Sequence, residues 1–219
     1  MATLAATALA AVPIAILRFV PPPTTAFMLR SRHADPATGA PCPDVAYAWV
    51  PREAIAADLR LAVLVAEDQR FYQHRGFDFG SMRRAFRDRV RYGRRRGAST
   101  LTQQLAKNLF LWPDATYTRK LVEAWFTFWI ETLWPKERIL EVYLNVAQFG
   151  PCRFGVGASS GVFFDKRPAA LEAREAALLA AVLPSPARMR AHDPGPYALE
   201  RTDAILALMA EHRGRLGRR

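Results

Sequence analysis

The chain has 219 residues, of which 51% are hydrophobic, and carries a formal net charge of +11. Its mean hydropathy is close to zero, which excludes an intrinsically disordered chain and a polytopic membrane protein. The length fits one domain with a hydrophobic core plus an appendage. The excess of arginine favours an anionic partner, which is a nucleic acid, a phosphate-bearing substrate or an acidic membrane surface.

The first 20 residues are expected to form a transmembrane anchor. Met1 to Leu17 contain no charged residue, Arg18 follows, and Pro21–Pro23 end the segment. About 20 apolar helical residues span a bilayer, and an arginine at the end can reach the interface. A cleaved signal peptide is the alternative, but it has a basic start and a small-residue cleavage site. The missing basic start also suggests that translation begins further upstream.

The rest of the chain is predicted to be a single, mainly α-helical domain. Residues 21–44 read as a Pro-rich linker, 45–212 as the domain and 213–219 as a disordered basic tail. A short strand is expected over 45–50 and a glycine-containing loop over 150–161. Apolar periodicity predicts helices over residues 51–67, 78–92, from 100 onwards, 118–134, from 135 onwards, 168–183 and 196–212.

Two cysteines occur, Cys42 and Cys152. In an oxidising compartment they could pair, but each lies beside a proline in an expected loop and nothing in the sequence sets their separation. We therefore expect two unpaired thiols.

A carboxylate pair, Glu67 and Asp68, closes the first apolar helix, and Phe71, His74 and Gly76 follow it. A helix C-terminus and hydrophobic neighbours both raise the pKa of a carboxyl group, which suits a general base working near neutrality. Taken alone, such a pair is more often solvated, and a lone histidine is more often structural than a ligand.

The segment from Gly97 to Asn108 is predicted to begin a helix that addresses an anion. Thr100 and Gln103 have the spacing of a capping box, and Gln103 and Lys107 are four residues apart, as are Gln104 and Asn108. The helix N-terminus, the hydroxyls of Ser99 and Thr100 and the Lys107 ammonium could bind a diphosphate. The alternative is an amphipathic helix with a polar outer face.

The following helix supplies two cations, Arg119 and Lys120, and a second carboxylate, Glu123. Arg119 and Glu123 are spaced to form a surface ion pair worth a few tenths of a kcal/mol. The helix is rich in aromatic residues, which favours core packing for Phe126 and membrane contact for Trp112.

Four ordered blocks together resemble the peptidoglycan glycosyltransferases of glycosyltransferase family 51, most closely the monofunctional biosynthetic type. The resemblance covers about residues 45–209. The blocks are Glu67-Asp-x-x-Phe-x-x-His-x-Gly76, Gly97-x-Ser-Thr-x-x-Gln-Gln-x-x-Lys-Asn108, Arg119-Lys-x-x-Glu123 and Arg138-Ile-Leu-Glu-x-Tyr-Leu-Asn145.

This resemblance implies a lysozyme-like fold and elongation of glycan chains from lipid II, with inversion at the anomeric carbon and release of undecaprenyl diphosphate. Glu67 and Glu123 would be the catalytic carboxylates. Lys107 and Arg119 would stabilise the departing diphosphate. The resemblance requires no cofactor, and a divalent ion, Mg²⁺ or Mn²⁺, could assist at the diphosphate. The remaining residues expected to bind substrate are Asp68, Phe71, His74, Ser99, Thr100, Gln103, Gln104, Asn108 and Lys120.

The resemblance also implies a location. The catalytic domain would lie in the periplasm, tethered by one span to the bacterial inner membrane, where cell-division or cell-wall synthesis proteins are possible partners. The chain ends too soon for a transpeptidase domain, so cross-linking would fall to another protein. The arginine-dense stretch fits an acidic membrane surface, and no nucleic-acid motif accompanies it. Its members are Arg83, Arg84, Arg87, Arg89, Arg91, Arg94, Arg95 and Arg96.

Two departures from the family pattern keep alternatives open. Ala115 stands where the family has an arginine for the diphosphate, and Gly157 stands where it has a glutamate. A catalytically impaired, membrane-tethered homologue that binds lipid II or cell-division proteins is one alternative. A lysozyme-like enzyme that cuts glycan at Glu67 is another, although cleavage of neutral glycan needs no cationic site.

Replacing Ala115 by arginine is expected to raise turnover, because loss of one desolvated charge contact to a leaving group costs about 2–4 kcal/mol. Steady-state kinetics of Ala115→Arg on lipid II measures the effect. A lower rate would show that another cation already occupies that space.

Overall fold

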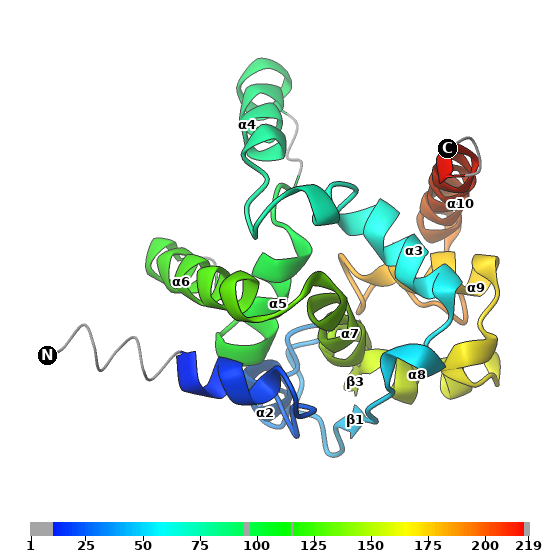
Figure 1. The fold of residues 1–219 in the computed structure, drawn as a ribbon. Coiled ribbons are helices and arrows are strands. Elements are labelled where there is room, and N and C mark those ends of the chain that lie inside the picture. Colours follow the sequence, from blue (N-terminus) through cyan, green and yellow to red (C-terminus); the bar gives the residue numbers. More distant parts are fainter. Residues whose placement is uncertain (1–10, 94–96, 115, 217–219) are drawn as a thin grey trace, which may run out of the picture.

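The computed structural model describes residues 11–93, 97–114 and 116–216, and this part of the chain is mainly helical, as predicted (Figure 1). Residues 11–17 are helical. The later helices are α2 (Ala26–Ser31), α3 (Ala57–Glu67), α4 (Phe79–Tyr92), α5 (Leu101–Phe110), α6 (Tyr117–Leu133), α7 (Lys136–Val146), α8 (Gly155–Phe164), α9 (Ala173–Val182) and α10 (Pro196–Leu216). Short 3₁₀ turns lie at Arg52–Ala54, Phe71–Gln73 and Pro168–Ala170, and the strands are β1 (Ala46–Tyr47), β2 (Gln148–Gly150) and β3 (Arg153–Phe154).

The core lies where α3, α9 and α10 pack together and where α7 packs against α5 and α8. Apolar residues on one face of α3, among them Leu59, Ala62 and Val63, are completely buried, as the helical spacing predicted. Tyr143 and Leu144 place α7 at the centre of the molecule. α3 and α5 are therefore rigidly supported where their ends approach each other.

The expectation of a loop at 150–161 was wrong, because most of this segment forms strand and helix. β2 and β3 are antiparallel, β1 joins β3 in parallel, and α8 begins directly afterwards. Its glycines serve close packing: a Cβ on Gly155 would lie 2.2 Å from the Asn145 carbonyl oxygen. The positive φ of 78° at Gly155 is also a conformation that glycine adopts freely.

Two side-chain caps fix the helices that carry the candidate site. Thr100 and Gln103 form the predicted capping box at the start of α5. Asp78 caps α4 by accepting from the backbone N–H of Ser81 at 2.9 Å, and Gly93 ends that helix in the left-handed conformation. α4 projects from the body of the molecule (Figure 1).

The residues predicted as a Pro-rich linker, 21–44, pack onto the domain. They contain α2, whose Phe27 and Met28 are buried and which contacts α5. The cause is the burial of two adjacent large apolar side chains, which removes them from water. A helix of six residues is too short for apolar periodicity to reveal this burial.

The segment before this linker also packs on the domain. Ile14 is fully buried, and its carbonyl oxygen accepts from Trp134 Nε1 at 2.7 Å. Arg138 donates to the carbonyl oxygens of Leu17 and Val20, both at 2.8 Å. The first ten residues of the predicted anchor lie outside the described part, and within residues 11–216, apart from the gaps stated above, no helix is long and apolar enough to cross a membrane.

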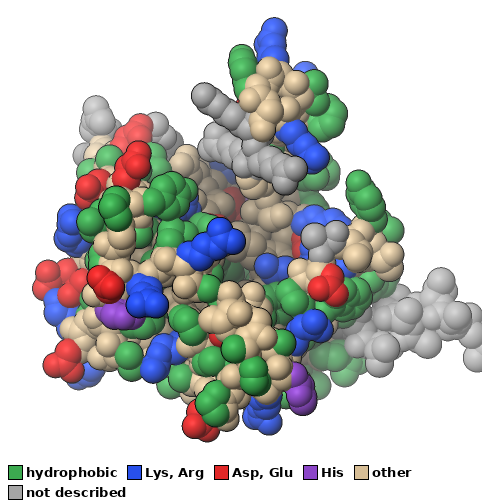
Figure 2. Space-filling model, turned by 180° about the vertical axis from the view of Figure 1, so that it is seen from behind, with side chains coloured by type: hydrophobic (Ala, Val, Ile, Leu, Met, Phe, Trp, Pro, Cys, Tyr) green, Lys and Arg blue, Asp and Glu red, His purple; other side chains and the backbone are tan. Residues whose placement is uncertain are grey.

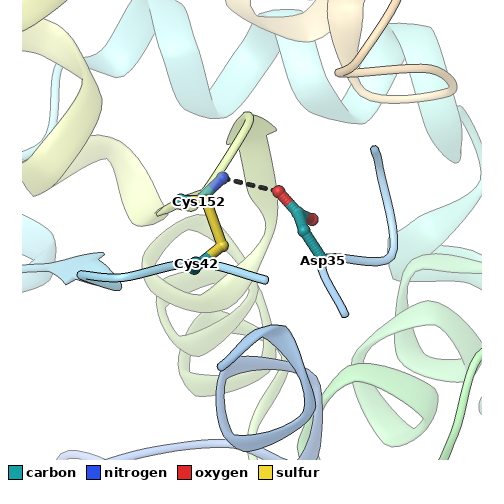
Figure 3. Close-up of side chains that lie close together, drawn as sticks. All are labelled: Asp35, Cys42 and Cys152. Carbon is teal, nitrogen blue, oxygen red and sulfur yellow. Dashed lines mark hydrogen bonds between the residues drawn. A yellow bond between two sulfur atoms is a disulfide. The ribbon is translucent and has the colours of Figure 1, made fainter. Parts of the chain in front are cut away.

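The expectation of two unpaired thiols was also wrong, because Cys42 and Cys152 form a disulfide with a Cα–Cα distance of 5.6 Å (Figure 3). Asp35 holds the two segments together by accepting from the backbone N–H of Cys152 at 2.7 Å and from Gln148 Nε2 at 2.5 Å. The parallel pairing of β1 with β3 brings them close, and the sequence carried no signal for that pairing.

The basic tail expected from residue 213 is helical as far as the structure describes it. α10 continues to Leu216, and Arg213 forms an ion pair with Asp58 at the start of α3. Residues 217–219 lie outside the described part.

Replacing both cysteines by serine is expected to lower the free energy of unfolding by about 2–4 kcal/mol, because the bond closes a loop of 110 residues in the unfolded chain. Denaturant unfolding with and without a reducing agent measures the effect. The reducing agent should destabilise the native protein by the same amount and leave the double variant unchanged. Equal stability of the two proteins under oxidising conditions would contradict the prediction.

Candidate active site

Glu67 is a largely buried carboxylate that accepts hydrogen bonds from two side chains. It is the last residue of α3, and its side chain is 13% exposed. One oxygen accepts from Gln104 Nε2 at 3.0 Å and the other from an Arg201 nitrogen at 3.0 Å. Burial raises the pKa of Glu67 above its ordinary value, and the contacts with Gln104 and Arg201 oppose that shift only in part. The direction is the one expected from the sequence.

Gln104 is itself oriented by a third group. The hydroxyl of Tyr143 donates to Gln104 Oε1 at 2.9 Å, so the amide nitrogen of Gln104 points to Glu67. Burial raises the pKa of Tyr143 well above its ordinary value, which keeps this hydroxyl protonated and able to donate. A chain of contacts therefore runs from the centre of the molecule to the carboxylate.

Asp68 holds the loop after α3 against the start of α5. Its carboxylate accepts from His74 Nε2 at 2.9 and 3.0 Å and from the backbone N–H of Leu101 at 3.0 Å. Phe71 is 1% exposed and packs beneath the Lys136 ammonium. These three residues of the first block, which we expected to bind substrate, have their side chains engaged within the protein.

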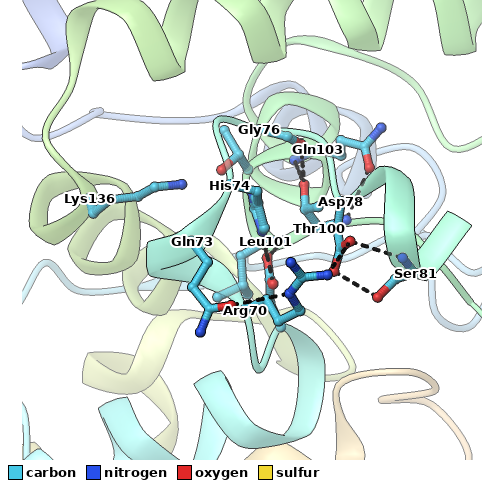
Figure 4. A network of polar contacts seen from close by, with 12 residues as sticks. Arg70, Gln73, His74, Gly76, Asp78, Ser81, Thr100, Leu101, Gln103 and Lys136 are labelled. Atoms are coloured by element: carbon cyan, nitrogen blue, oxygen red, sulfur yellow. Dashed lines mark hydrogen bonds and ion pairs between the residues drawn. The ribbon is translucent and has the colours of Figure 1, made fainter.

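The start of α5 also uses most of its polar groups internally. Thr100 donates to the Gly76 carbonyl oxygen at 2.7 Å, and Gln103 Oε1 accepts from the Thr100 N–H at 3.0 Å (Figure 4). Both side chains are nearly buried. Ser99 is exposed and accepts from Lys120 Nζ at 3.2 Å, so of these three residues it is the one that faces solvent.

Arg119 and Glu123 on α6 form a buried ion pair, not the surface pair that spacing suggested, and Lys120 joins it from the solvent side. Arg119 and Glu123 are 8% and 2% exposed, and Arg119 donates to Glu123 Oε2 at 2.5 Å. Lys120 contacts the other carboxylate oxygen. Packing of α6 against α5 covers this face, which helical spacing alone does not show. Two cations share one carboxylate, so the cluster has a net positive charge.

Lys107 projects from α5 with no such partner. Within the described residues it makes no ion pair, and its ammonium lies 5.3 Å from the centre of the Phe27 ring. Burial lowers the pKa of Lys107, nearby Glu123 raises it, and Arg119 and Lys120 lower it further. Both Glu123 and Glu67 act on the charge of Lys107, so the cation lies near both acids.

Two cavities meet these residues. One, of about 200 Å³, lies between the end of α3, α4 and the start of α5 and is lined by Glu67, Ser99 and Thr100. The other, of about 210 Å³, is lined by Gln104, Lys107 and Asn108. Gln104 contacts Glu67 and lines the second cavity, so it stands between the acid and the cation. The surface is hollowed beside the base of α4 (Figure 2).

Sequence reasoning missed several residues of the site. Arg201 lies 134 residues after Glu67, on α10. The sequence around it is that of an ordinary charged helix and contains no motif that predicts a role in the site. Arg70, Asp78 and Ser81 form a polar network on the wall of the first cavity (Figure 4). Tyr143 was part of a recognised block, but its contact with Gln104 depends on how α7 packs on α5.

The two departures from the family pattern have different outcomes. At Gly157 a Cβ would lie 2.2 Å from the Ala48 carbonyl oxygen, so α8 packs on the segment after β1 too closely for a side chain. Ala115 lies outside the described residues.

Comparison with known proteins gives a consistent family. The family model described as transglycosylase matches residues 41–210. A biosynthetic peptidoglycan transglycosylase of Aeromonas hydrophila is 46% identical over 91% of this chain and 84% of its own length. Proteins of the same description from Bdellovibrio bacteriovorus and Pseudomonas aeruginosa are 45% and 46% identical over 90% and 86% of this chain, and 78% and 81% of their own lengths.

Replacing Arg201 by methionine is expected to raise the pKa of Glu67 further, because it removes a positive charge and a donor from the carboxylate. A base is active when deprotonated, so the acid limb of the pH–rate profile should move to higher pH and lost activity should return as the pH rises. Arg174→Met, which disrupts an exposed pair with Asp203, is the control. An unshifted acid limb in Arg201→Met would count against the contact.

Proposed function

We infer that this chain, which belongs to the transglycosylase family, polymerises peptidoglycan glycan strands as a peptidoglycan glycosyltransferase of the cell envelope. The observation that carries the mechanism concerns Gln104, which donates to Glu67, a carboxylate whose pKa is raised, and lines one cavity with Lys107. Among the described residues, Lys107 is a cation without an ion pair. An acid and a cation at one site suit a reaction in which a proton is removed at one end and negative charge develops at the other.

Glu67 would act as the general base. It accepts the proton of the 4-hydroxyl of the acceptor sugar, whose oxygen attacks the anomeric carbon of the donor with inversion. The bond from that carbon to the diphosphate breaks, and the electron pair leaves with the diphosphate. Gln104 and Arg201 hold the carboxylate in one orientation, and their donors limit how far burial raises its pKa.

The leaving diphosphate would be stabilised mainly by Lys107, with the positive cluster of Arg119 and Lys120 behind it. Glu123 orients the two cations of the cluster and keeps their charges at fixed positions. Asn108 has its side chain on the second cavity and would bind phosphate or sugar oxygens. A divalent cation, if one takes part, would be held chiefly by diphosphate oxygens, because both oxygens of Glu123 already accept from Arg119 and Lys120.

Lipid II and nascent glycan on undecaprenyl diphosphate are the proposed substrates, which places the site at a bilayer surface. Two helices beside the cavities support this by exposing large apolar side chains. On α4 these alternate with arginines, a pattern suited to an acidic lipid surface (Figure 2). The exposed residues are Phe79, Met82, Phe86, Val90 and Tyr92 on α4, Tyr117, Leu121, Trp125 and Phe128 on α6, and Trp112 between α5 and α6. We propose an inner-membrane location with the domain in the periplasm, and cell-wall synthesis or cell-division proteins as partners.

Two other functions are less well supported. Cleavage of neutral glycan at Glu67 would leave the cations around Glu123 and Lys107 without a purpose. An inactive binding homologue was suggested by Ala115 and Gly157. Ala115 lies outside the described residues, and the glycine at 157 is explained by the packing of α8. Assays on purified lipid II and on intact sacculi separate the three functions. The polymerase makes long glycan from lipid II, the hydrolase cuts sacculi, and the binding protein does neither.

Glu67→Gln is expected to lower the rate of lipid II polymerisation by about 10²- to 10⁴-fold, because the amide cannot accept the proton. Gel separation of the glycan products measures chain elongation, and circular dichroism checks the fold. Glu53→Gln, at an exposed acid before α3, is the control and should elongate normally. Substantial elongation by Glu67→Gln would defeat the catalytic assignment.

A further inference from the structure

We propose that Phe27 is a positioning residue for Lys107, and that the N-terminal segment, defined as residues 26–42, forms one wall of the diphosphate site. This inference rests on the proposed function. It adds a part of the chain that precedes the recognised blocks and that the sequence presented as a linker.

The geometry of the contact is that of a cation over an aromatic face. Lys107 Nζ lies 5.3 Å from the centre of the Phe27 ring, within the range of about 6 Å over which the ring attracts a cation. Phe27 is 7% exposed, so water does not screen the interaction strongly. α2 packs against α5, the helix that carries Lys107, and the two elements are neighbours in Figure 1.

The other charged groups around Lys107 are already committed. Glu123 accepts from Arg119 and Lys120 on α6, and Glu67, at the end of α3, accepts from Gln104 and Arg201. A carboxylate bonded to Lys107 would compete with phosphate oxygens for its N–H donors. An aromatic face attracts the ammonium without neutralising it, so the ring restrains the side chain while the charge stays available.

The N-terminal segment is held too firmly to be a passive tether. Thr25 caps α2 by accepting from the Met28 N–H at 3.1 Å, and Ser31 donates to the Phe27 carbonyl oxygen at 2.8 Å. The Cys42 N–H donates to the Ser31 carbonyl oxygen at 2.8 Å, and Cys42 is covalently joined to Cys152. These contacts fix the backbone that presents the ring to Lys107.

The same segment reaches the cavity at a second place. Pro36 and Ala37 line it together with Phe27. Asp35, next to them, accepts from the Ala37 N–H at 2.9 Å and from Gln148 Nε2. Two separate parts of the segment therefore border the space around Lys107, as a wall of the site would.

Phe27→Leu and Phe27→Met keep an apolar side chain and remove the ring, and Phe27→Tyr keeps the ring. Met28→Leu changes the other buried apolar side chain of the same helix, which makes no aromatic contact with Lys107. On lipid II, kcat of the first two variants should fall about 3- to 10-fold with a smaller change in KM. Phe27→Tyr and Met28→Leu should stay within about twofold of the native kcat. Thermal unfolding identifies any variant that does not fold, and either ring-less variant suffices.

A second measurement reads Lys107 without catalysis. The rate at which an acylating reagent modifies Lys107, followed by mass spectrometry across pH, should titrate at lower pH in Phe27→Leu, because the ring favours the charged ammonium. Native kcat and an unshifted titration in a folded ring-less variant would overturn the inference, and so would an equal loss in Met28→Leu. If the native protein does not polymerise lipid II, the proposed function fails, while the titration still decides whether Phe27 positions Lys107.

Discussion

The chemistry of this protein depends on keeping the Glu67 carboxylate largely buried and still able to ionise. Removing a carboxylate from water is costly unless donors replace the lost hydrogen bonds. Glu67 has two such donors, and they come from different parts of the chain, Gln104 on α5 and Arg201 on α10. Because each donor is carried by a helix packed in the core, the carboxylate can be oriented only when α3, α5 and α10 are assembled. The site is therefore a product of the whole fold and not of one motif.

The second constraint is the arrangement of charge around this acid. Glu123 is shared by Arg119 and Lys120, which leaves that cluster positive, and Lys107 lies near enough to both the cluster and Glu67 to feel their charges. If Lys107 paired with Glu67, the base would be neutralised and the cation occupied. The bridge of Gln104 from Tyr143 to Glu67 supplies the acid with a neutral donor instead. The proton acceptor and the stabilising cation thus stay separate across one amide, as a displacement with charge at its two ends requires.

Local signals in the sequence were enough to predict most of the helices, although not α2 or α8, and the direction of the Glu67 pKa shift. Apolar periodicity located α3, the spacing of Thr100 and Gln103 located the start of α5, and the position of Glu67 at a helix end gave the direction of its pKa shift. Long-range contacts could not be predicted in this way. Arg201 is recognisable only from the packing of α10 on α3, and the burial of the Arg119–Glu123 pair only from the packing of α6 on α5. The lysozyme-like fold itself, expected from family resemblance, stays a prediction.

The structure differs most from the sequence-based expectation at residues 21–44, which were predicted to be a linker and pack onto the domain. Prolines, small polar residues and weak periodicity are typical of a linker, and that composition is what the segment has. Its order comes instead from a few specific contacts: two buried side chains on α2, the carboxylate of Asp35 and the bond between Cys42 and Cys152. A short segment can be fixed by such contacts while burying little apolar surface. The disulfide to the turn between β2 and β3 limits the conformational freedom that a linker would otherwise keep. The residues from Ile14 to Val20, just before this segment, are also fixed, because Trp134 donates to the Ile14 carbonyl oxygen and Arg138 donates to those of Leu17 and Val20. These bonds couple the direction of the helix at residues 11–17 to the domain that carries the site.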